Sequence, residues 1–274
     1  MKFEEYFLKN NSFILMGDIR GGIHPWSILH EISTQITALN NDKDNALPDY
    51  YKSAFHTSSS APVSSRGTKK HITALQTVML DEDMYIEDME IFIGKGTEIE
   101  FGAMIKGPAY ISENCQIRHA SYIRGGVIAG KGCVIGHCSE IKNSILMDES
   151  HAGHFNYVGD SVLGHHVNLG AGTKLANLQF RTNKEIDNDL IKEIVIQGNY
   201  TENTGEATRT GLTKLGAIIG DYTEVGCNSV TSPASIIGAN CWIYPNTSLT
   251  KGFYKPNSII KNPSGNRCEI TSRP

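Results

Sequence analysis

Residues 151–160, HAGHFNYVGD, carry two histidines and a tyrosine in a stretch that follows neither a helical nor a strand period. An imidazole with an ordinary pKa of about 6.5 can take up a proton close to neutral pH, so histidine is the usual general base. His154, with Tyr157 beside it, is the candidate for that role. His151 is expected on a solvent-exposed loop, and His165 and His166 in a corner turn with a polar surface role.

On both sides of this segment an aliphatic or small residue recurs at every sixth position. The first run is Ile93, Ile99, Ile105, Ile111, Ile117, Ile123, Ala129, Ile135, Ile141 and Met147. The period resumes in new phases at Leu163, Leu169 and Leu175, and from Ile219 to Leu249. A period of six fits neither a helix nor simple strand alternation. It predicts a parallel β-helix in which each hexapeptide forms one short strand and one turn, and three hexapeptides close a coil.

Two cations are spaced to meet on this solenoid. Arg124 and Lys142 are one coil apart and should lie one above the other. Such a pair is unfavourable unless an anion bridges the two cations, and phosphate is the anion that such pairs usually bind. Two plainer interpretations stay open: solvated side chains on an outer face, and a corner bulge without function for the interruption at 148–157.

The run EIKNSILMDESHAGHFNYVGDSVLGHHVNLGAGTKLAN, at 140–177, resembles a known enzyme family. It is similar to the acetyltransferase half of the bifunctional N-acetylglucosamine-1-phosphate uridyltransferase/glucosamine-1-phosphate acetyltransferases, and to their archaeal relatives. The resemblance extends over residues 87–262 and does not include a uridyltransferase domain. It implies an all-β fold, a left-handed parallel β-helix, with a small N-terminal α/β appendage and an inserted loop.

The resemblance also implies roles for individual residues. His154 matches the general base. The GAGT turn offers the backbone N–H of Ala171 to the developing oxyanion, and one such donor is worth about 3 kcal/mol. Contacts to the acceptor sugar and its phosphate fall on Arg124, Lys142, Tyr157, Asn168, Asn177 and Lys214. Glu140 is a further candidate, which could orient His154 or bind the amine.

The resemblance implies that Ala171, Cys227, Pro245 and Lys261 contact acetyl-CoA. Two positions depart from the family pattern: Leu178 replaces a tyrosine after Asn177, and the late arginine near the CoA phosphates falls at Lys261 and Asn262. The second departure puts the anchoring of CoA in question.

These matches imply an acetyl-CoA-dependent N-acetyltransferase acting on an amino-sugar phosphate, with glucosamine 1-phosphate as the first candidate. Family members are homotrimers with active sites between neighbouring coils, and the same is expected here. The alternatives are a nucleotide-linked amino-sugar acceptor and a non-catalytic assembly or regulatory module. Zinc carbonic anhydrases share the hexapeptide fold but need closely spaced histidines, and no H-x4-H pair occurs among the coil histidines, so no metal is expected.

Three regions lie outside the periodic coil. Residues 1–82 are expected to form a cap over the open edge of the first coil, with a helix from Pro25 to Asn40. Residues 83–262 form the β-helix domain, interrupted by an external insertion at 178–213 whose KEIVIQG run could form half a hairpin. Residues 263–274 are a C-terminal tail.

Composition sets the remaining expectations. The chain has 274 residues and a net charge of −4, which argues against nucleic-acid binding and a polybasic membrane patch. No run approaches the length of a transmembrane helix and no signal peptide is visible, so a cytoplasmic protein is expected. The six cysteines are dispersed and are expected to be buried, reduced thiols.

Overall fold

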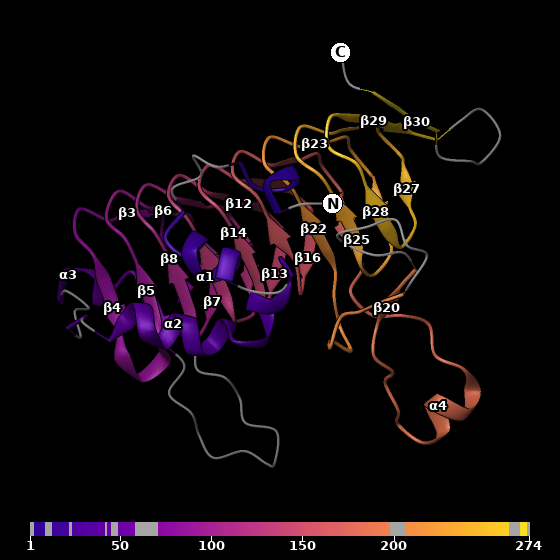
Figure 1. Cartoon of the computed structure of the whole chain (residues 1–274). Helices are drawn as coiled ribbons and strands as arrows, with labels where there is room; N and C mark the ends of the chain where they lie inside the picture. The colour runs from indigo at the N-terminus through magenta and orange to yellow at the C-terminus, as the bar shows by residue number, and fades with distance from the viewer. Residues whose placement is uncertain are drawn as a thin grey trace.

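The computed structural model describes residues 3–8, 13–21, 24–41, 43–44, 49–57, 71–197, 207–262 and 269–272. Three long sheets run side by side along the molecule, and the chain passes from one to the next as it winds (Figure 1). We call them sheets A, B and C.

The strands of sheet A, in spatial order, are β28 (Gly252–Tyr254), β25 (Ser235–Ile237), β22 (Ala217–Ile219), β17 (Val162–Leu163), β14 (Ser144–Leu146), β11 (Val127–Ala129), β8 (Ala109–Ile111), β5 (Ile91–Ile93) and β4 (Met84–Ile86). Those of sheet B are β1 (Phe55–Thr57), β2 (His71–Ala74), β7 (Met104–Lys106), β10 (Tyr122–Ile123), β13 (Glu140–Lys142), β16 (Tyr157–Gly159), β19 (Lys174–Leu175), β24 (Val230–Thr231) and β27 (Ser248–Leu249). Those of sheet C are β3 (Val78–Met79), β6 (Glu98–Ile99), β9 (Gln116–Ile117), β12 (Val134–His137), β15 (His151–His154), β18 (Asn168–Leu169), β23 (Glu224–Val225), β26 (Trp242–Ile243), β29 (Ser258–Lys261) and β30 (Glu269–Ser272).

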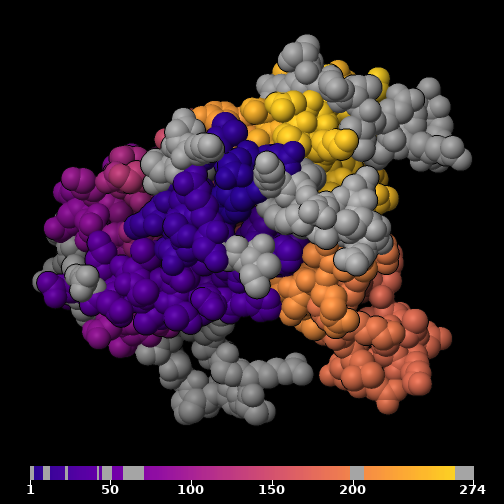
Figure 2. All heavy atoms as spheres, in the orientation of Figure 1, coloured from indigo at the N-terminus to yellow at the C-terminus, as the bar shows by residue number. Residues whose placement is uncertain are grey.

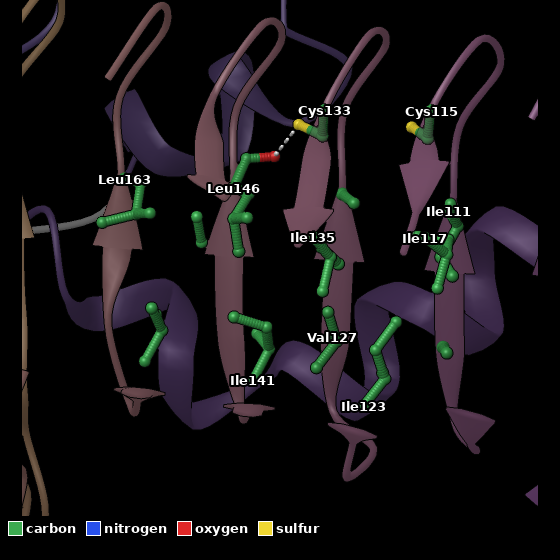
Figure 3. Close-up of a cluster of buried hydrophobic side chains, with 14 of the residues drawn as sticks. Ile111, Cys115, Ile117, Ile123, Val127, Cys133, Ile135, Ile141, Leu146 and Leu163 are labelled. Carbon is green, nitrogen blue, oxygen red and sulfur yellow. Dashed lines mark hydrogen bonds between the residues drawn. The ribbon is translucent and has the colours of Figure 1, made fainter. Parts of the chain in front are cut away.

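Each coil takes one strand from each sheet, and equivalent strands of successive coils pair in parallel. Complete coils run from β5–β6–β7 to β25–β26–β27, and β28 and β29 begin a further one. The predicted parallel β-helix is therefore confirmed. The periodic isoleucines line its interior, where Ile111, Ile117 and Ile123 are fully buried (Figure 3).

The predicted break at 148–157 is absent. Strand β15 pairs in parallel with β12, placing Ile135 beside Ala152, and β16 pairs in parallel with β13. The coil is shortened by one residue instead, because Leu146 rather than Met147 lies opposite Ala129 and faces the interior. Met147 is buried in a separate cluster on the outside of sheet A.

The same shortening occurs again between Val158 and Leu163 and between Leu249 and Tyr254, so the inward positions shift phase without a gap in the ladder. His151 consequently lies in strand β15 and is half-buried, and the expectation of an exposed loop is wrong. The interior residue of this strand is Ala152, where the neighbouring coils have Ile135 and Leu169.

The N-terminal segment covers two surfaces of the coil. Its helices up to Asn40 lie along the outer face of sheet A, and Figure 2 shows these residues spread over that face. The helices are η1 (Phe3–Glu5), α1 (Met16–Gly21), η2 (Ser27–His30), α2 (Ile32–Asn40) and α3 (Asp49–Lys52), followed later by η3 (Glu87–Met89). The predicted helix at 25–40 is thus two helices, η2 and α2, joined at Glu31.

Strands, together with α3, cover the open edge of the first coil, and Tyr51 of α3 packs into the interior cluster. Strand β2 pairs antiparallel with β7, β3 with β6 and β4 with β5, so each sheet ends in a non-coil strand. An unpaired sheet edge invites pairing with other chains, and these strands remove it. The edge-shielding role expected for residues 1–82 falls to part of the segment, while α2 contacts β8 and β11 on the side.

The insertion between β19 and β22 lies outside the coil. It contains α4 (Asn183–Asp187), which begins with a capping box between Thr182 and Glu185, and it extends away from the sheets (Figure 1). The KEIVIQG run forms β20 (Val195–Ile196), which pairs antiparallel with β21 (Thr208–Arg209). The domain boundaries proposed from the sequence remain predictions.

The cysteines are of two kinds. Cys115, Cys133 and Cys241 are buried as predicted, whereas Cys138 and Cys227 are exposed, which the sequence interpretation did not foresee. Cys268 lies outside the described residues. Figure 3 shows the first two buried sulfurs at the edge of the interior ladder, with Cys133 facing the Leu146 carbonyl.

Candidate active site

His154 lies at the corner where the chain passes from sheet C to sheet B. It ends β15, and Tyr157 begins β16. The imidazole is exposed, and no hydrogen-bond partner for its ring is found within the described ranges. The side chain is therefore available to an incoming molecule.

The predicted acetyl-CoA residues stack on His154 along this corner. Each corner residue is joined to the next coil by a backbone hydrogen bond: His154 O accepts from Gly172 N, Ala171 O from Asn228 N, and Cys227 O from Asn246 N, at 3.0, 2.8 and 2.8 Å. The register thus places His154, Ala171, Cys227 and Pro245 in one line, which we call the corner line.

The N–H of Ala171 has no acceptor in the described part of the chain. It is a free donor one coil away from His154, as the predicted role requires. Lys261, the last predicted cofactor residue, lies in β29 at the far end, and the Asn262 amide donates to Asn246 O at 2.7 Å.

Two hollows follow the sheet C side of this line. One, of about 640 Å³, is lined by His151, His154, Asn168 and Ala171, among others. The second, of about 410 Å³, shares Asn168 and is lined by Cys227, Trp242 and Pro245. An elongated ligand could therefore lie along sheet C beside the corner line.

Most of the predicted acceptor residues lie on the other side of the corner, on or beside sheet B. They are Arg124, Glu140, Lys142, Tyr157 and Asn177. Tyr157 OH donates to Asn177 Oδ1 at 3.4 Å, and burial raises the pKa of Tyr157. Lys214 is adjacent to this group, because the N–H of Leu215 donates to Asn177 O.

Asn168 does not join this group. It lies in β18 of sheet C beside His151, and its amide donates to Glu224 Oε2 at 2.9 Å. The structure therefore separates Asn168 from Lys142 and places it beside the hollows of sheet C.

The stacking of Arg124 on Lys142 is confirmed, but neither cation lacks a counter-ion. Arg124 Nη1 lies 2.5 Å from Glu140 Oε1, and Lys142 Nζ lies 3.3 Å from Asp160 Oδ2. The hydrogen bond to Glu140 raises the pKa of Arg124. The expectation that only an external anion could relieve the pair is wrong, because the register brings a carboxylate to each.

The two ion pairs differ in burial. The Arg124 and Glu140 side chains are 42% and 33% exposed, so their pair contributes only about 0–1 kcal/mol. The Asp160 side chain is 8% exposed and also accepts from the amides of Asn143 and Asn177. Asp160 is a structural centre that sequence reasoning missed, although it closes the same HAGHFNYVGD segment.

The corner line continues in the opposite direction as an aromatic series. Phe101, His119 and His137 stack with centroids 5.9 and 5.5 Å apart, and His137 packs edge-on against Phe155. The Nδ1 atoms of His119 and His137 lie 2.6 and 3.1 Å from backbone carbonyls. His154 differs from them because its ring makes no such bond among the described residues.

Comparisons with known proteins bear on the same region. Residues 105–199 match the family model of the GMPPB C-terminal domain. The chain is 36% identical over 108 residues to a bifunctional sugar-1-phosphate nucleotidylyltransferase/acetyltransferase from Sulfurisphaera tokodaii, covering 39% of this chain and 23% of that protein. It is 33% identical over 118 residues to the bifunctional protein GlmU of Methanococcus aeolicus, covering 43% and 25%.

These matches confirm the predicted resemblance, and they span about a quarter of the length of those relatives. Among solved structures, the acetyltransferase domain of PglB from Neisseria gonorrhoeae with acetyl coenzyme A aligns at TM-score 0.35 and 13% identity, over 57% of each chain. A mutant form of AntD, an N-acyltransferase from Bacillus cereus, in complex with dTDP and coenzyme A aligns at TM-score 0.30 and 16% identity, over 66% of this chain and 84% of that one.

The described residues contain no group of three or more His, Cys, Asp or Glu side chains placed to hold a metal ion. Within the same ranges, no helix has both the length and the hydropathy needed to span a bilayer.

Proposed function

We propose that the chain is an acetyl-CoA-dependent N-acetyltransferase whose acceptor is an amino-sugar phosphate, with glucosamine 1-phosphate as the first candidate. The corner line carries this proposal, because it aligns an exposed imidazole, a free backbone N–H and the two hollows of sheet C. The match to bifunctional nucleotidylyltransferase/acetyltransferases supports the acyl-transfer part.

In the proposed reaction, the nitrogen of the acceptor amine attacks the thioester carbonyl, and His154 takes a proton from this amine. A C–N bond forms, the carbonyl oxygen becomes an oxyanion, and the Ala171 N–H donates to it. Collapse of this intermediate breaks the C–S bond and releases coenzyme A, whose sulfur ends protonated. The coenzyme A part of the co-substrate lies along sheet C, beside Cys227 and Pro245.

The acceptor phosphate would lie on sheet B. Because the Arg124–Glu140 pair is exposed and weak, a phosphate can replace Glu140 on the guanidinium at little cost. Glu140 would then be free to face the acceptor ammonium. Lys142 stays bound to the buried Asp160 and adds positive potential. Tyr157, Asn177 and Lys214 border the sugar in this arrangement.

The active unit in this proposal is a homotrimer. The outer face of sheet A is covered by the N-terminal helices, so the subunits would meet through sheets B and C, the two faces that flank the corner line.

An acceptor panel tests the proposal. The chain is incubated with acetyl-CoA and, separately, glucosamine 1-phosphate, a second amino-sugar phosphate and a nucleotide-linked amino sugar, and thiol release is followed. Turnover with an amino-sugar phosphate is expected. Turnover with the nucleotide-linked amino sugar alone would show that the acceptor belongs to that class and not to the amino-sugar phosphates. No turnover in the whole panel would favour a non-catalytic module.

A further inference from the structure

A buried amide lies directly beneath the corner line. Asn156 is 2% exposed and follows His154 by two residues. Its Oδ1 accepts the His154 backbone N–H at 3.0 Å, and its Nδ2 donates to Gly170 O at 2.9 Å. The amide orientation is fixed by these partners, because an N–H can only donate and a carbonyl can only accept.

Asn156 is unlike every other residue at its position in the repeat. The position two residues before the inward residue of each sheet B strand carries a small side chain in the other complete coils: Ala103, Ser121, Ser139, Thr173, Ser229 and Thr247. A larger side chain occurs only in the coil that carries His154.

Two other members of this column, Thr173 and Ser229, bind the next coil through their hydroxyls. Thr173 Oγ1 donates to Gly226 O at 3.5 Å, and Ser229 Oγ donates to Tyr244 O at 3.0 Å. Each hydroxyl therefore binds the carbonyl that precedes the corner residue of the next coil. Asn156 makes the equivalent bond to Gly170 O and adds a bond to the His154 N–H, which no hydroxyl in the described column makes to its own corner residue.

The Gly170 carbonyl belongs to the same peptide group as the Ala171 N–H. A donor on the carbonyl oxygen polarises that peptide and strengthens the N–H as a donor, and it also fixes the peptide plane. One amide thus connects the backbone of the proposed base with the proposed oxyanion donor in the next coil.

We propose that Asn156 is a positioning residue that holds His154 and the Ala171 N–H in one fixed geometry. The inference rests on the proposed function. Its physical content is that the two bonds of Asn156 set the distance and direction between the groups that act on the amine and on the carbonyl oxygen.

Asn156→Ser tests this inference, because serine is what the repeat itself uses at the position. The hydroxyl can still donate to Gly170 O, as Ser229 does to Tyr244 O, but it is too short to hold the His154 N–H. We expect an intact oligomer with an unchanged melting temperature, unchanged KM values, and kcat lower by about tenfold to a hundredfold. Ser121→Ala is the matched control: the Ser121 hydroxyl is buried and has no hydrogen-bond partner among the residues that the structure describes, so kcat should not change.

An Asn156→Ser enzyme with wild-type kcat would overturn the inference, and so would a loss of activity that Ser121→Ala shares. A second readout does not depend on activity. Amide hydrogen exchange measured by NMR should become faster at His154 in Asn156→Ser while the amide of Val158 stays protected. Unchanged exchange at His154 would contradict the coupling even if no acceptor is turned over, whereas inactivity of the wild type alone would count only against the proposed function.

Discussion

Cys227 and Cys138 are two exposed thiols that lie on opposite sides of His154 along the corner line. Cys227 is on the side proposed for acetyl-CoA, in the hollow with Trp242 and Pro245, while Cys138 lies 3.4 Å from the His137 ring in the aromatic series. The buried thiols are chemically different: burial raises the pKa of Cys115 to about 12, and the pKa of Cys133 is raised for the same reason. The thiolate is the reactive form, so among the five cysteines in the described residues only the exposed pair should react readily.

Alkylation of the folded protein should therefore modify Cys138 and Cys227 and spare Cys115, Cys133 and Cys241, as read by peptide mass spectrometry. Acetyl-CoA at saturating concentration should protect Cys227 and leave Cys138 unprotected. Equal modification of both thiols with and without acetyl-CoA would remove the cofactor from this side of the corner. Cys138 serves as the internal control in each sample.

The ion pairs of sheet B show where residue-level reasoning from the sequence ends. The spacing of Arg124 and Lys142 predicted their stacking, because the two residues lie one coil apart in a fixed period. Their carboxylate partners were not predicted. Glu140 belongs to the coil after that of Arg124, and Asp160 is separated from Lys142 by a coil that is one residue shorter than the regular repeat. Assigning them requires the register of each coil, and the register depends on packing.

At the scale of the strand, β15 is the element that gives the corner its geometry. The steps from Ile135 to Ala152 and from Ala152 to Leu169 are each one residue shorter than the step from Ile117 to Ile135. The inward residue of β15 is Ala152, at a position occupied by larger aliphatic residues in the other coils. A shorter perimeter encloses less space, so a small side chain fits where isoleucine fits elsewhere.

Ala152→Ile should therefore destabilise the protein although it restores the consensus of the ladder. Overpacking a filled core costs about 1–3 kcal/mol, which would appear as a lower midpoint of urea unfolding. Ile135→Val, one coil earlier, is the comparison, with an expected loss of about 0.5–1.5 kcal/mol. A more stable Ala152→Ile protein would show that the coil has unfilled space beneath His154.

The strands were predictable because each strand has one inward aliphatic residue, and these residues recur at every sixth position in the sequence. The phase shift was misread because Leu146 and Met147 are both apolar, so a fixed period could choose either. The structure buries both, one inside the coil and the other under the N-terminal helices. HAGHFNYVGD appeared irregular because its inward residues are Ala152 and Val158, each one position before the glycine that a fixed period from Met147 selects.

For the whole molecule, the covering of sheet A limits how copies of the chain can associate. Its outward residues Tyr110, Ile128 and Ile145 are buried against the N-terminal segment, which covers this face (Figure 2). Sheets B and C are the two long faces that the described N-terminal helices leave open. The proposed active site lies at the corner between those two faces.

Sedimentation velocity should accordingly show a trimer of 30.0 kDa chains at the concentrations used for assay. The physical reason is that a single exposed corner leaves the acetyl group and the acceptor in water. A neighbouring subunit packed at this corner would exclude that water. Monomers that retain full activity would contradict a site shared between subunits. The substitution Thr34→Arg, on the exposed side of α2, should leave the trimer intact.

If the His154 imidazole deprotonates the acceptor amine, its removal must slow thiol release. Wild type, His154→Ala and His151→Ala are assayed with acetyl-CoA and glucosamine 1-phosphate at matched oligomeric state. Both histidines line the same hollow, so His151→Ala controls for a general disturbance of strand β15. We predict that His154→Ala lowers kcat by about 10²–10⁴-fold and that His151→Ala retains most of the wild-type rate. Comparable rates for wild type and His154→Ala would contradict the account.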